Sequence, residues 1–341
     1  MVPALLFLCV GVPLAELLDR LGYFEAVAAL VQGRGAEVRV GVLWTLACVT
    51  TAILNLDTTV VLLTPLSVRL ARRSGTDPFT LALIPLFTAA FASSFLPVSN
   101  LTTLIVTERL DLTVADVLTH LAIPGFAACV VGWIVFRRGA PRILASVTHD
   151  VVDRRVLTIG SCVVAGLLVG FVFGGLWGID PWVVALVADL LLALVTRTLP
   201  WRSVPVFTAT GVAMVGLATA LLVPASATHR LATVDAPLAL AGTVGIAAGV
   251  ANVVNNLPAT LIGLEGVDSA TWGMWAWLLG VNTGSVILPL GALANILWWR
   301  IVRREEVDVD VRTYVRATVP VAVPALIAAA LCLAVASVLS G

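Results

Sequence analysis

Long stretches without a charged residue constrain the fold of this chain more than any other feature of its sequence. A helix needs about 20 residues to cross the hydrocarbon core of a bilayer. Six uncharged runs exceed that length: 78–107, 156–179, 203–228, 236–264, 269–299 and 317–341. Four further apolar segments, 1–18, 38–54, 114–136 and 181–196, bring the expected number of crossings to about ten. The sequence therefore predicts an all-α polytopic membrane protein.

The composition argues against several other classes of protein. Charged residues make up 12% of the chain, about half of what a soluble domain carries. All twenty basic residues are Arg and the formal net charge is zero, so no nucleic-acid partner is implied. The sequence contains no Walker A motif and no other pattern that predicts an enzyme, a cofactor or a metal site.

The cysteines lie singly in apolar stretches, at Cys9, Cys48, Cys129, Cys162 and Cys332. None belongs to a CxxC motif or to a close pair, so the sequence predicts neither a disulfide framework nor a thiol cluster. A buried free cysteine usually acts as a small apolar residue. We therefore expect chemistry that does not depend on thiols.

A polar pattern occurs twice inside the apolar sequence. Residues 55–65 read NLDTTVVLLTP and residues 255–264 read NNLPATLIGL, with starts 200 positions apart. Further along, residues 97–105 read PVSNLTTLI and residues 289–297 read PLGALANIL, with starts 192 positions apart. Polar side chains within a bilayer face a partner, a cavity or a ligand. Such a paired set is typical of a secondary transporter built from two repeats.

Arginine placement predicts the orientation of the chain. Loops 69–77, 137–155 and 300–316 are rich in Arg. By the positive-inside rule we expect all three on the cytoplasmic side of a multi-pass protein of the plasma membrane. Loops 107–112 and 263–271, which occupy corresponding positions in the other half, are not basic.

Corresponding loops are thus expected on opposite sides of the membrane, as inverted-topology repeats require. We expect an N-terminal repeat over 1–138, an Arg-rich cytoplasmic linker over 139–154 and a C-terminal repeat over 155–341. The alternative is a set of crossings whose loops alternate by chance.

Proline and glycine predict discontinuous helices. The run 78–107 contains FLPVSN at 95–100, and the run 269–299 contains GVNTG at 280–284 and PLG at 289–291. Proline removes a backbone donor and glycine leaves helical geometry easily. Unwound backbone at membrane depth is tolerated where it is buried in protein or lines a cavity. We therefore expect each half to supply a broken or re-entrant helix near a solute site at the midplane.

The second-half segments at 255–264 and 280–302 resemble those of the arsenite permeases of the ArsB type, and LDTTVVLLTP and LPVSNLTTLIV resemble the matching first-half segments. The resemblance implies a member of the ion-transporter superfamily that exports arsenite or antimonite, driven by the proton motive force. It also implies a soluble ATPase subunit as a partner with which family members can work. Family members begin with further helices, so we expect a short or truncated start here.

The chain departs from the family pattern at both motifs. Asn55-Leu56-Asp57-Thr58 stands where the family commonly has Asn-Asp-Gly, and Leu288 and Ala292 flank the later Pro-x-Gly where the family has Thr and Ser. A sodium–proton antiporter and a dicarboxylate-like or sulfate-like anion carrier remain alternatives. Every Arg lies in or near a loop, which weakens the anion alternative.

Asp57 is the strongest candidate for chemistry because it lies inside apolar sequence. An acid at such a position can take up and release a proton during transport. The alternative is a helix cap through the backbone amides of Thr59 or Val60. Asp189, within the apolar run VVALVADLLLALV, is a second proton group, the partner of an Arg, or a residue close to the membrane interface.

Amide and hydroxyl side chains around the two motifs form the expected lining for a small inorganic solute. They are Asn55, Thr58, Thr59, Ser99, Asn100, Thr102 and Thr103 in the first half and Asn255, Asn256, Asn282, Thr283 and Asn295 in the second. Their donors and acceptors suit As(OH)₃ or a partly dehydrated Na⁺. The alternative is hydrogen bonding between helices. The apolar helix surfaces also permit a homodimer without specifying one.

Overall fold

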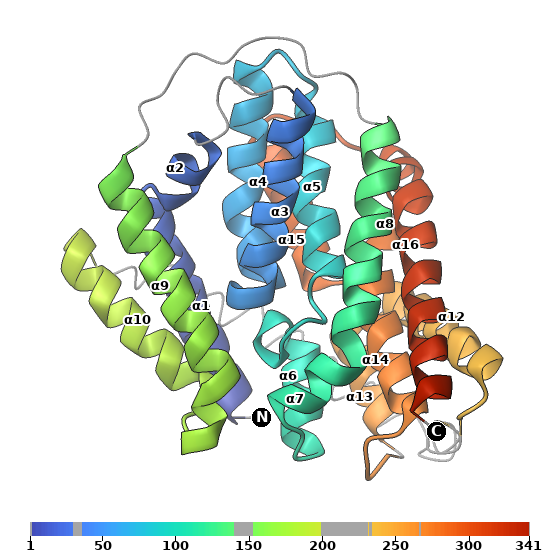
Figure 1. Ribbon diagram of the computed structural model, residues 1–341. Helices are drawn as coiled ribbons and strands as arrows, with labels where there is room; N and C mark the ends of the chain where they lie inside the picture. Colours follow the sequence, from blue (N-terminus) through green and yellow to red (C-terminus); the bar gives the residue numbers. More distant parts are fainter. Residues whose placement is uncertain are drawn as a thin grey trace.

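The computed structural model describes residues 2–29, 36–139, 153–198, 231, 234–265 and 267–340. Over these residues the chain is helical, which confirms the predicted all-α class (Figure 1). Four helices are long and apolar enough to cross a membrane: Val114–Gly139, Arg154–Trp177, Pro237–Val254 and Val311–Leu339. Shorter apolar helices cover Val38–Leu54, Pro78–Phe91 and Pro181–Thr196. The crossing expected at 203–228 lies outside the described residues.

One group of helices lies to the side of the molecule (Figure 1). It consists of α1 (Val2–Arg20), α2 (Tyr23–Ala29), α9 (Arg154–Phe173), η3 (Gly174–Trp177) and α10 (Pro181–Thr196). Helix α1 packs along α10, and α9 contacts both α10 and α2. Phe7 and Phe171 meet edge to face with ring centroids 5.8 Å apart, which joins α1 to α9.

The second group carries the first polar motif. It consists of α3 (Ala36–Leu54), α4 (Leu56–Arg73), α5 (Pro78–Phe91), η1 (Pro97–Ser99), α6 (Leu101–Arg109), α7 (Val114–Val117), the π-helical turn η2 (Leu118–Ala122) and α8 (Ile123–Gly139). Helix α5 begins where Asp77 accepts hydrogen bonds from the amides of Phe79 and Thr80, with Pro78 in the first turn. The bend at 92–100 confirms the interruption expected within 78–107.

The third group carries the second polar motif. It consists of α12 (Pro237–Val254), α13 (Asn256–Leu264), α14 (Trp272–Gly284), η6 (Ser285–Ile287), α15 (Leu293–Arg304) and α16 (Val311–Leu339). Helix α14 packs on α12, α15 packs on α4, and α16 packs on α8. The last two contacts join this group to the second one.

The interruption expected at 280–284 is wrong, because α14 continues through it to Gly284. The glycines serve close packing instead. A Cβ at Gly280 would overlap the Val244 carbonyl, and one at Gly284 would overlap the Ala248 side chain, both on α12. The helix ends immediately afterwards, in the 3₁₀ turn that leads to Pro289, so only the second expected interruption is confirmed.

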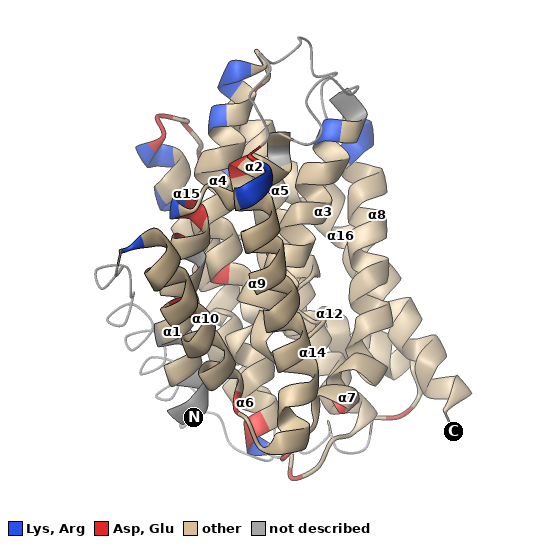
Figure 2. Ribbon diagram, turned by 60° about the vertical axis from the view of Figure 1, so that its left-hand side comes forward, with Lys and Arg blue, Asp and Glu red and all other residues tan. Residues whose placement is uncertain are grey.

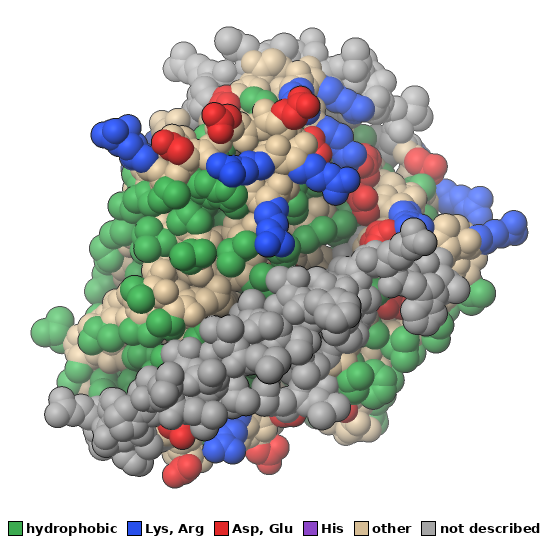
Figure 3. Space-filling view, turned by 180° about the vertical axis from the view of Figure 1, so that it is seen from behind, with side chains coloured by type: hydrophobic (Ala, Val, Ile, Leu, Met, Phe, Trp, Pro, Cys, Tyr) green, Lys and Arg blue, Asp and Glu red, His purple; other side chains and the backbone are tan. Residues whose placement is uncertain are grey.

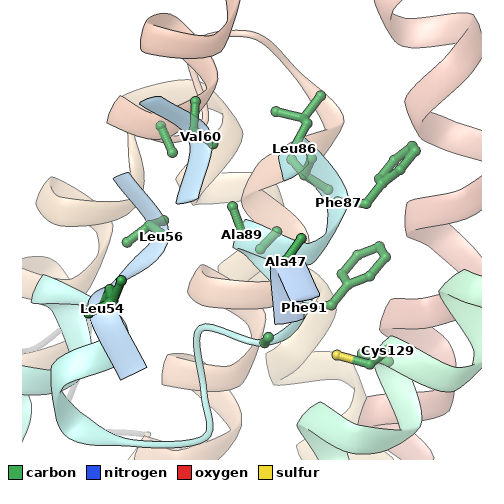
Figure 4. Packing of buried hydrophobic residues seen from close by; sticks show 14 of the residues in the cluster. Ala47, Leu54, Leu56, Val60, Leu86, Phe87, Ala89, Phe91 and Cys129 are labelled. Atoms are coloured by element: carbon green, nitrogen blue, oxygen red, sulfur yellow. The ribbon is translucent and has the colours of Figure 1, made fainter. Parts of the chain in front are cut away.

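Buried hydrophobic side chains hold α3, α5 and α8 together, among them Ala47, Phe91 and Cys129 (Figure 4). The Trp44 ring lies 6.4 Å from Phe91 and 5.6 Å from Phe136 between centroids. In the same region Cys48 of α3 and Cys129 of α8 line one groove, which the spacing of the cysteines in the sequence did not indicate. Packing of α3 on α8 brings together two cysteines that are 81 positions apart in sequence.

On the described part of the face in Figure 3, charged side chains gather mainly toward the two ends and hydrophobic side chains lie between them; we call this hydrophobic surface the apolar belt. Basic residues concentrate at one end, where α4, α8 and α15 finish with Arg in their last turns (Figure 2). Loops 69–77 and 300–316 and the described part of 137–155 thus share this end. At the opposite end, α6 finishes with Arg109.

Candidate functional site

Asn282 on α14 joins polar residues of the second half of the chain to those of the first. Its side-chain oxygen accepts hydrogen bonds from Asn100 Nδ2 at 3.0 Å and from Thr102 Oγ1 at 2.5 Å. Its side-chain nitrogen donates to Thr103 Oγ1 at 2.9 Å and to Ser94 Oγ at 3.4 Å. All five side chains are buried. One amide of the second half therefore binds four polar groups of the first half, and we call these five residues the Asn282 cluster.

Ser99 and Asn100 hold the break between α5 and α6. Ser99 Oγ lies within hydrogen-bond distance of two carbonyl oxygens, Ser93 O at 2.8 Å and Leu96 O at 2.5 Å. Asn100 Oδ1 accepts from the Thr102 amide at 3.1 Å and so caps α6. Ser99 is thus occupied by the backbone, whereas Asn100 also reaches Asn282.

Asn295 holds the corresponding break between α14 and α15. Its Nδ2 donates to Ser285 O at 2.8 Å and to Leu288 O at 3.0 Å. Ser285 and Leu288 lie 192 positions after Ser93 and Leu96. The carbonyl oxygens of that earlier pair are the ones that Ser99 Oγ reaches in the first half. Asn295 therefore supports the backbone of the break and lies outside the Asn282 cluster.

Asn252 supports the same break, and the sequence analysis did not identify it. Its Nδ2 donates to Gly284 O at 2.8 Å, and its Oδ1 accepts from the Leu288 amide at 2.7 Å. A Cβ at Gly291 would lie 2.7 Å from Asn252 Oδ1 and would overlap the Ser285 carbonyl, so only glycine fits there.

Asn255 forms a second break, between α12 and α13. Its φ is 83°, in the region that most side chains avoid. Its Nδ2 donates to Leu290 O at 2.9 Å, and the neighbouring Asn256 amide donates to Gly291 O at 2.8 Å. The two interruptions of the second half are therefore bound to each other.

Asn55 forms the equivalent break between α3 and α4, with φ at 115°. Its Oδ1 accepts from the Thr58 amide at 3.1 Å. Thr59 Oγ1 donates to Asn55 O at 3.0 Å and also receives a hydrogen bond from Thr51 Oγ1 at 3.0 Å. Asn55 is thus the cap of α4. The alternative in which Asp57 caps the helix is wrong.

Asp57 lies in the first turn of α4 with 6% of its surface exposed. Within the described part of the chain its Oδ1 is buried without a hydrogen-bond partner. The same holds for Thr58 Oγ1 and Thr64 Oγ1 on α4 and for Thr283 Oγ1 beside Asn282. Buried polar atoms normally have partners, and clusters of exceptions indicate function.

Charge in the interior is acidic and sparse. Among the buried side chains that the structure describes, the charged ones are those of Asp57 and Asp189, and none belongs to an Arg. Asp189 lies on α10, in the group formed with α1 and α9, and is not part of the Asn282 cluster. The arrangement offers amides, hydroxyls and one carboxyl on α4 for binding a solute or a proton.

The structure brings together Asn100, Thr102, Thr103 and Asn282 from the expected set and adds Ser94 to them. It assigns Asn55, Asn255 and Asn256 to the helix breaks, with Asn295 and Ser99 supporting them. The adjacent serines Ser93 and Ser94, polar residues within the uncharged run 78–107, were a sequence signal that we did not use.

Trp298, near the end of the uncharged run 269–299, packs inside the protein. Its side chain is fully buried, and its Nε1 donates to Ala82 O at 2.6 Å. The ring also meets Tyr314 of α16 with centroids 5.6 Å apart. Trp298 thus fastens α15 to α5 and α16, and it does so a few residues from the Asn295 break.

Comparison with known proteins agrees with this architecture. Residues 1–281 match the profile of the citrate transporter (CitMHS) family. The chain belongs to the citrate transporter family. It is therefore a multi-pass membrane transporter, which agrees with the buried polar breaks and the apolar belt.

The chain is also similar to proteins named arsenical pump membrane proteins, as the resemblance of the motifs predicted. It is 26% identical to that of Escherichia coli K12 and 28% identical to that of Yersinia enterocolitica. Each alignment covers 91% of this chain and 81% of the relative. The fold is similar to the crystal structure of the Alcanivorax borkumensis YdaH transporter, described as having an unusual topology. That match has a TM-score of 0.54 and 14% identity, and covers 97% of this chain and 84% of the other.

Proposed function

We propose that this transporter exports arsenite or antimonite as a neutral hydroxylated solute, driven by the proton motive force. The observation that carries the proposal is the composition of the Asn282 cluster. It consists of amides and hydroxyls, which donate to and accept from an As(OH)₃ molecule equally well. The similarity to arsenical pump membrane proteins supports the same solute.

The lining also argues for a neutral solute. A citrate or dicarboxylate ion carries charge that a buried site would have to balance. No Arg is among the described buried side chains, and the one carboxyl near the breaks, that of Asp57, would repel an anion when ionised. An uncharged metalloid hydroxide needs no such balance.

In this proposal Asp57 is the proton carrier. Its Oδ1 has no hydrogen-bond partner in the described part of the chain, so the carboxyl is available to a proton or to the solute. Burial favours the neutral carboxylic acid, and release of the proton then requires a change of surroundings. Alternating access of the Asn55 end of α4 to the two sides would provide that change.

We infer the orientation from the Arg-rich end. By the positive-inside rule, loops 69–77, 137–155 and 300–316 lie in the cytoplasm and the chain lies in the plasma membrane. Residues 1–138 and 155–341 then act as the two inverted repeats around the linker 139–154. The same Arg-rich surface would receive a soluble ATPase subunit, and the apolar belt would receive a second copy in a homodimer.

A second candidate is an organic anion carrier of the citrate type, which the family match favours. In this case the N-termini of α4, α6 and α13, each capped by Asn, would attract the carboxylates. Arsenite and citrate can be told apart in one assay.

The assay measures arsenite accumulation in efflux-deficient cells that express the chain, with a protonophore control. The proposal predicts lower accumulation than in cells with an empty vector and return to the empty-vector level when the protonophore is added. Excess citrate should not compete. Unchanged arsenite accumulation together with citrate uptake, in cells whose membranes contain the folded protein, would reject arsenite in favour of the anion.

A further inference from the structure

Two cysteines line one groove between α3 and α8, outside the Asn282 cluster. Cys48 lies about one helical turn after Trp44 and Cys129 about one turn before Trp133, and the two tryptophan rings are 5.7 Å apart between centroids. Both are free cysteines, and Cys48 is partly exposed whereas Cys129 is buried. The two thiols therefore lie at the contact between the two helices, with Cys48 accessible from the groove.

The accessible side is an apolar groove of about 760 Å³ between these helices. Besides the two cysteines its walls include Trp44, Trp133 and Phe126. None of the described residues that line it is charged, and its one hydroxyl, Thr45 Oγ1, donates to the Gly41 carbonyl of the same helix. The two thiols are thus the groups in the groove best suited to bind a ligand chemically.

An apolar groove restricts which thiol ligand it accepts. A metal cation would bring charge into surroundings that cannot solvate it. A trivalent metalloid hydroxide does not, because As(OH)₃ and two thiols condense to (RS)₂AsOH and two molecules of water. Two As–S bonds form while two As–O and two S–H bonds break, and arsenic stays trivalent. Every species in this reaction is neutral, and thiols are ligands for soft elements.

We propose that Cys48 and Cys129 form a dithiol site for trivalent arsenicals, open to the apolar belt of the protein. The site goes beyond the proposed function, since it binds its ligand whether or not the chain transports arsenite. An organic arsenical, which partitions into lipid, suits the groove best.

The location connects the site to the transport machinery. Phe95 lines the groove and directly follows Ser94, which receives a hydrogen bond from Asn282. The dithiol site therefore lies on the outer side of the same helix break whose inner side forms the Asn282 cluster. A bridging arsenical would tie α3 to α8 beside this break.

Phenylarsine oxide is the probe, because it condenses with two thiols and releases one water. Purified full-length protein in lipid nanodiscs is treated with it, and the adduct is measured by intact mass spectrometry and located by peptide mapping. We expect a single adduct that bridges the peptides containing Cys48 and Cys129 and that is removed by 2,3-dimercaptopropanol. A bridge between other cysteines, or none in the folded protein, overturns the proposal.

Matched variants test whether Cys48 and Cys129 are the two attachment points. Cys48→Ser or Cys129→Ser should weaken retention of the probe by on the order of a hundredfold, since one attachment replaces two. Cys162→Ser and Cys332→Ser, which change thiols outside the groove, should retain it fully. Equal loss in all four variants would contradict the assignment, and the wild-type map decides the matter even if a groove variant fails to fold.

Discussion

Asn100 and Asn282 lie 182 residues apart, yet Asn100 Nδ2 donates to Asn282 Oδ1 at 3.0 Å. The first residue caps the helix after the Pro97 break, and the second lies on α14 between two glycines that pack on α12. Any movement of α14 relative to α6 must therefore break or carry along this hydrogen bond. The pair directly links the motif at 97–105 to α14 in the second half of the chain.

Replacement of Asn282 by alanine should abolish transport while the protein still folds. The change leaves the hydroxyls of Thr102 and Thr103 without this partner, whereas Asn100 Nδ2 keeps Ser93 Oγ at 3.3 Å, and each buried unsatisfied group costs about 1–3 kcal/mol. Arsenite efflux and thermal stability should be measured together. Thr88→Val is the control, because Thr88 is buried but its hydroxyl bonds within α5. Transport lost equally in both variants would mean that stability, and not the cluster, sets activity.

Asp57→Asn should remove the dependence of transport on the proton gradient. The amide has the shape of the carboxyl but does not exchange a proton, so efflux should fall to the level seen with a protonophore. The measurement is efflux at several external pH values. Asp189→Asn provides the comparison, since Asp189 is also buried and lies on α10. If Asp189→Asn alone removes the pH dependence, the proton group is on α10.

Asn255→Gly should preserve the fold but lower transport. Glycine adopts a φ of 83° without strain, whereas the substitution removes the hydrogen bond from Asn255 Nδ2 to Leu290 O. Asn255→Leu should in contrast destabilise the protein by about 1–3 kcal/mol, because a non-glycine residue there is strained. Thermal unfolding of the two variants distinguishes backbone strain from loss of the amide. Equal stability of both variants would show that the backbone conformation is not a constraint.

Gly284→Ala should destabilise the contact between α14 and α12. The added methyl overlaps Ala248, and overpacking of this kind costs about 1–3 kcal/mol. Gly249→Ala is the matched control, because a Cβ at Gly249 meets no atom within 4 Å. A lower melting temperature for Gly284→Ala than for Gly249→Ala is expected. The reverse order would contradict the packing of these helices.

The sequence predicted the fold well where one kind of residue has one common role. Uncharged runs longer than a bilayer crossing predicted helices, and Pro97 and Pro289 predicted the breaks beside them. Gly280 and Gly284 led to the wrong prediction of a helix interruption at 280–284. A glycine that allows close helix packing and a glycine that ends a helix look alike in sequence. Only the position of α12 distinguishes the two roles.

The site was predicted in kind but not in detail. The Asn-led motifs identified the correct segments, yet which amide binds the other half depends on how α14 faces α6. Asn252 was missed because a single Asn within an alanine-rich helix carries no motif. Cys48 and Cys129 were missed because a contact between two distant helices leaves no trace in the spacing of their residues.

Proton movement in proteoliposomes tests the account most directly. Purified protein is reconstituted into vesicles loaded with arsenite and a pH-sensitive dye, and the vesicles are diluted into buffer without arsenite. If Asp57 couples proton movement to a neutral hydroxylated solute, outward arsenite flux should acidify the lumen with the wild-type protein and not with Asp57→Asn, and citrate should not replace arsenite. Equal acidification by Asp57→Asn, or acidification with citrate and none with arsenite, would contradict the account.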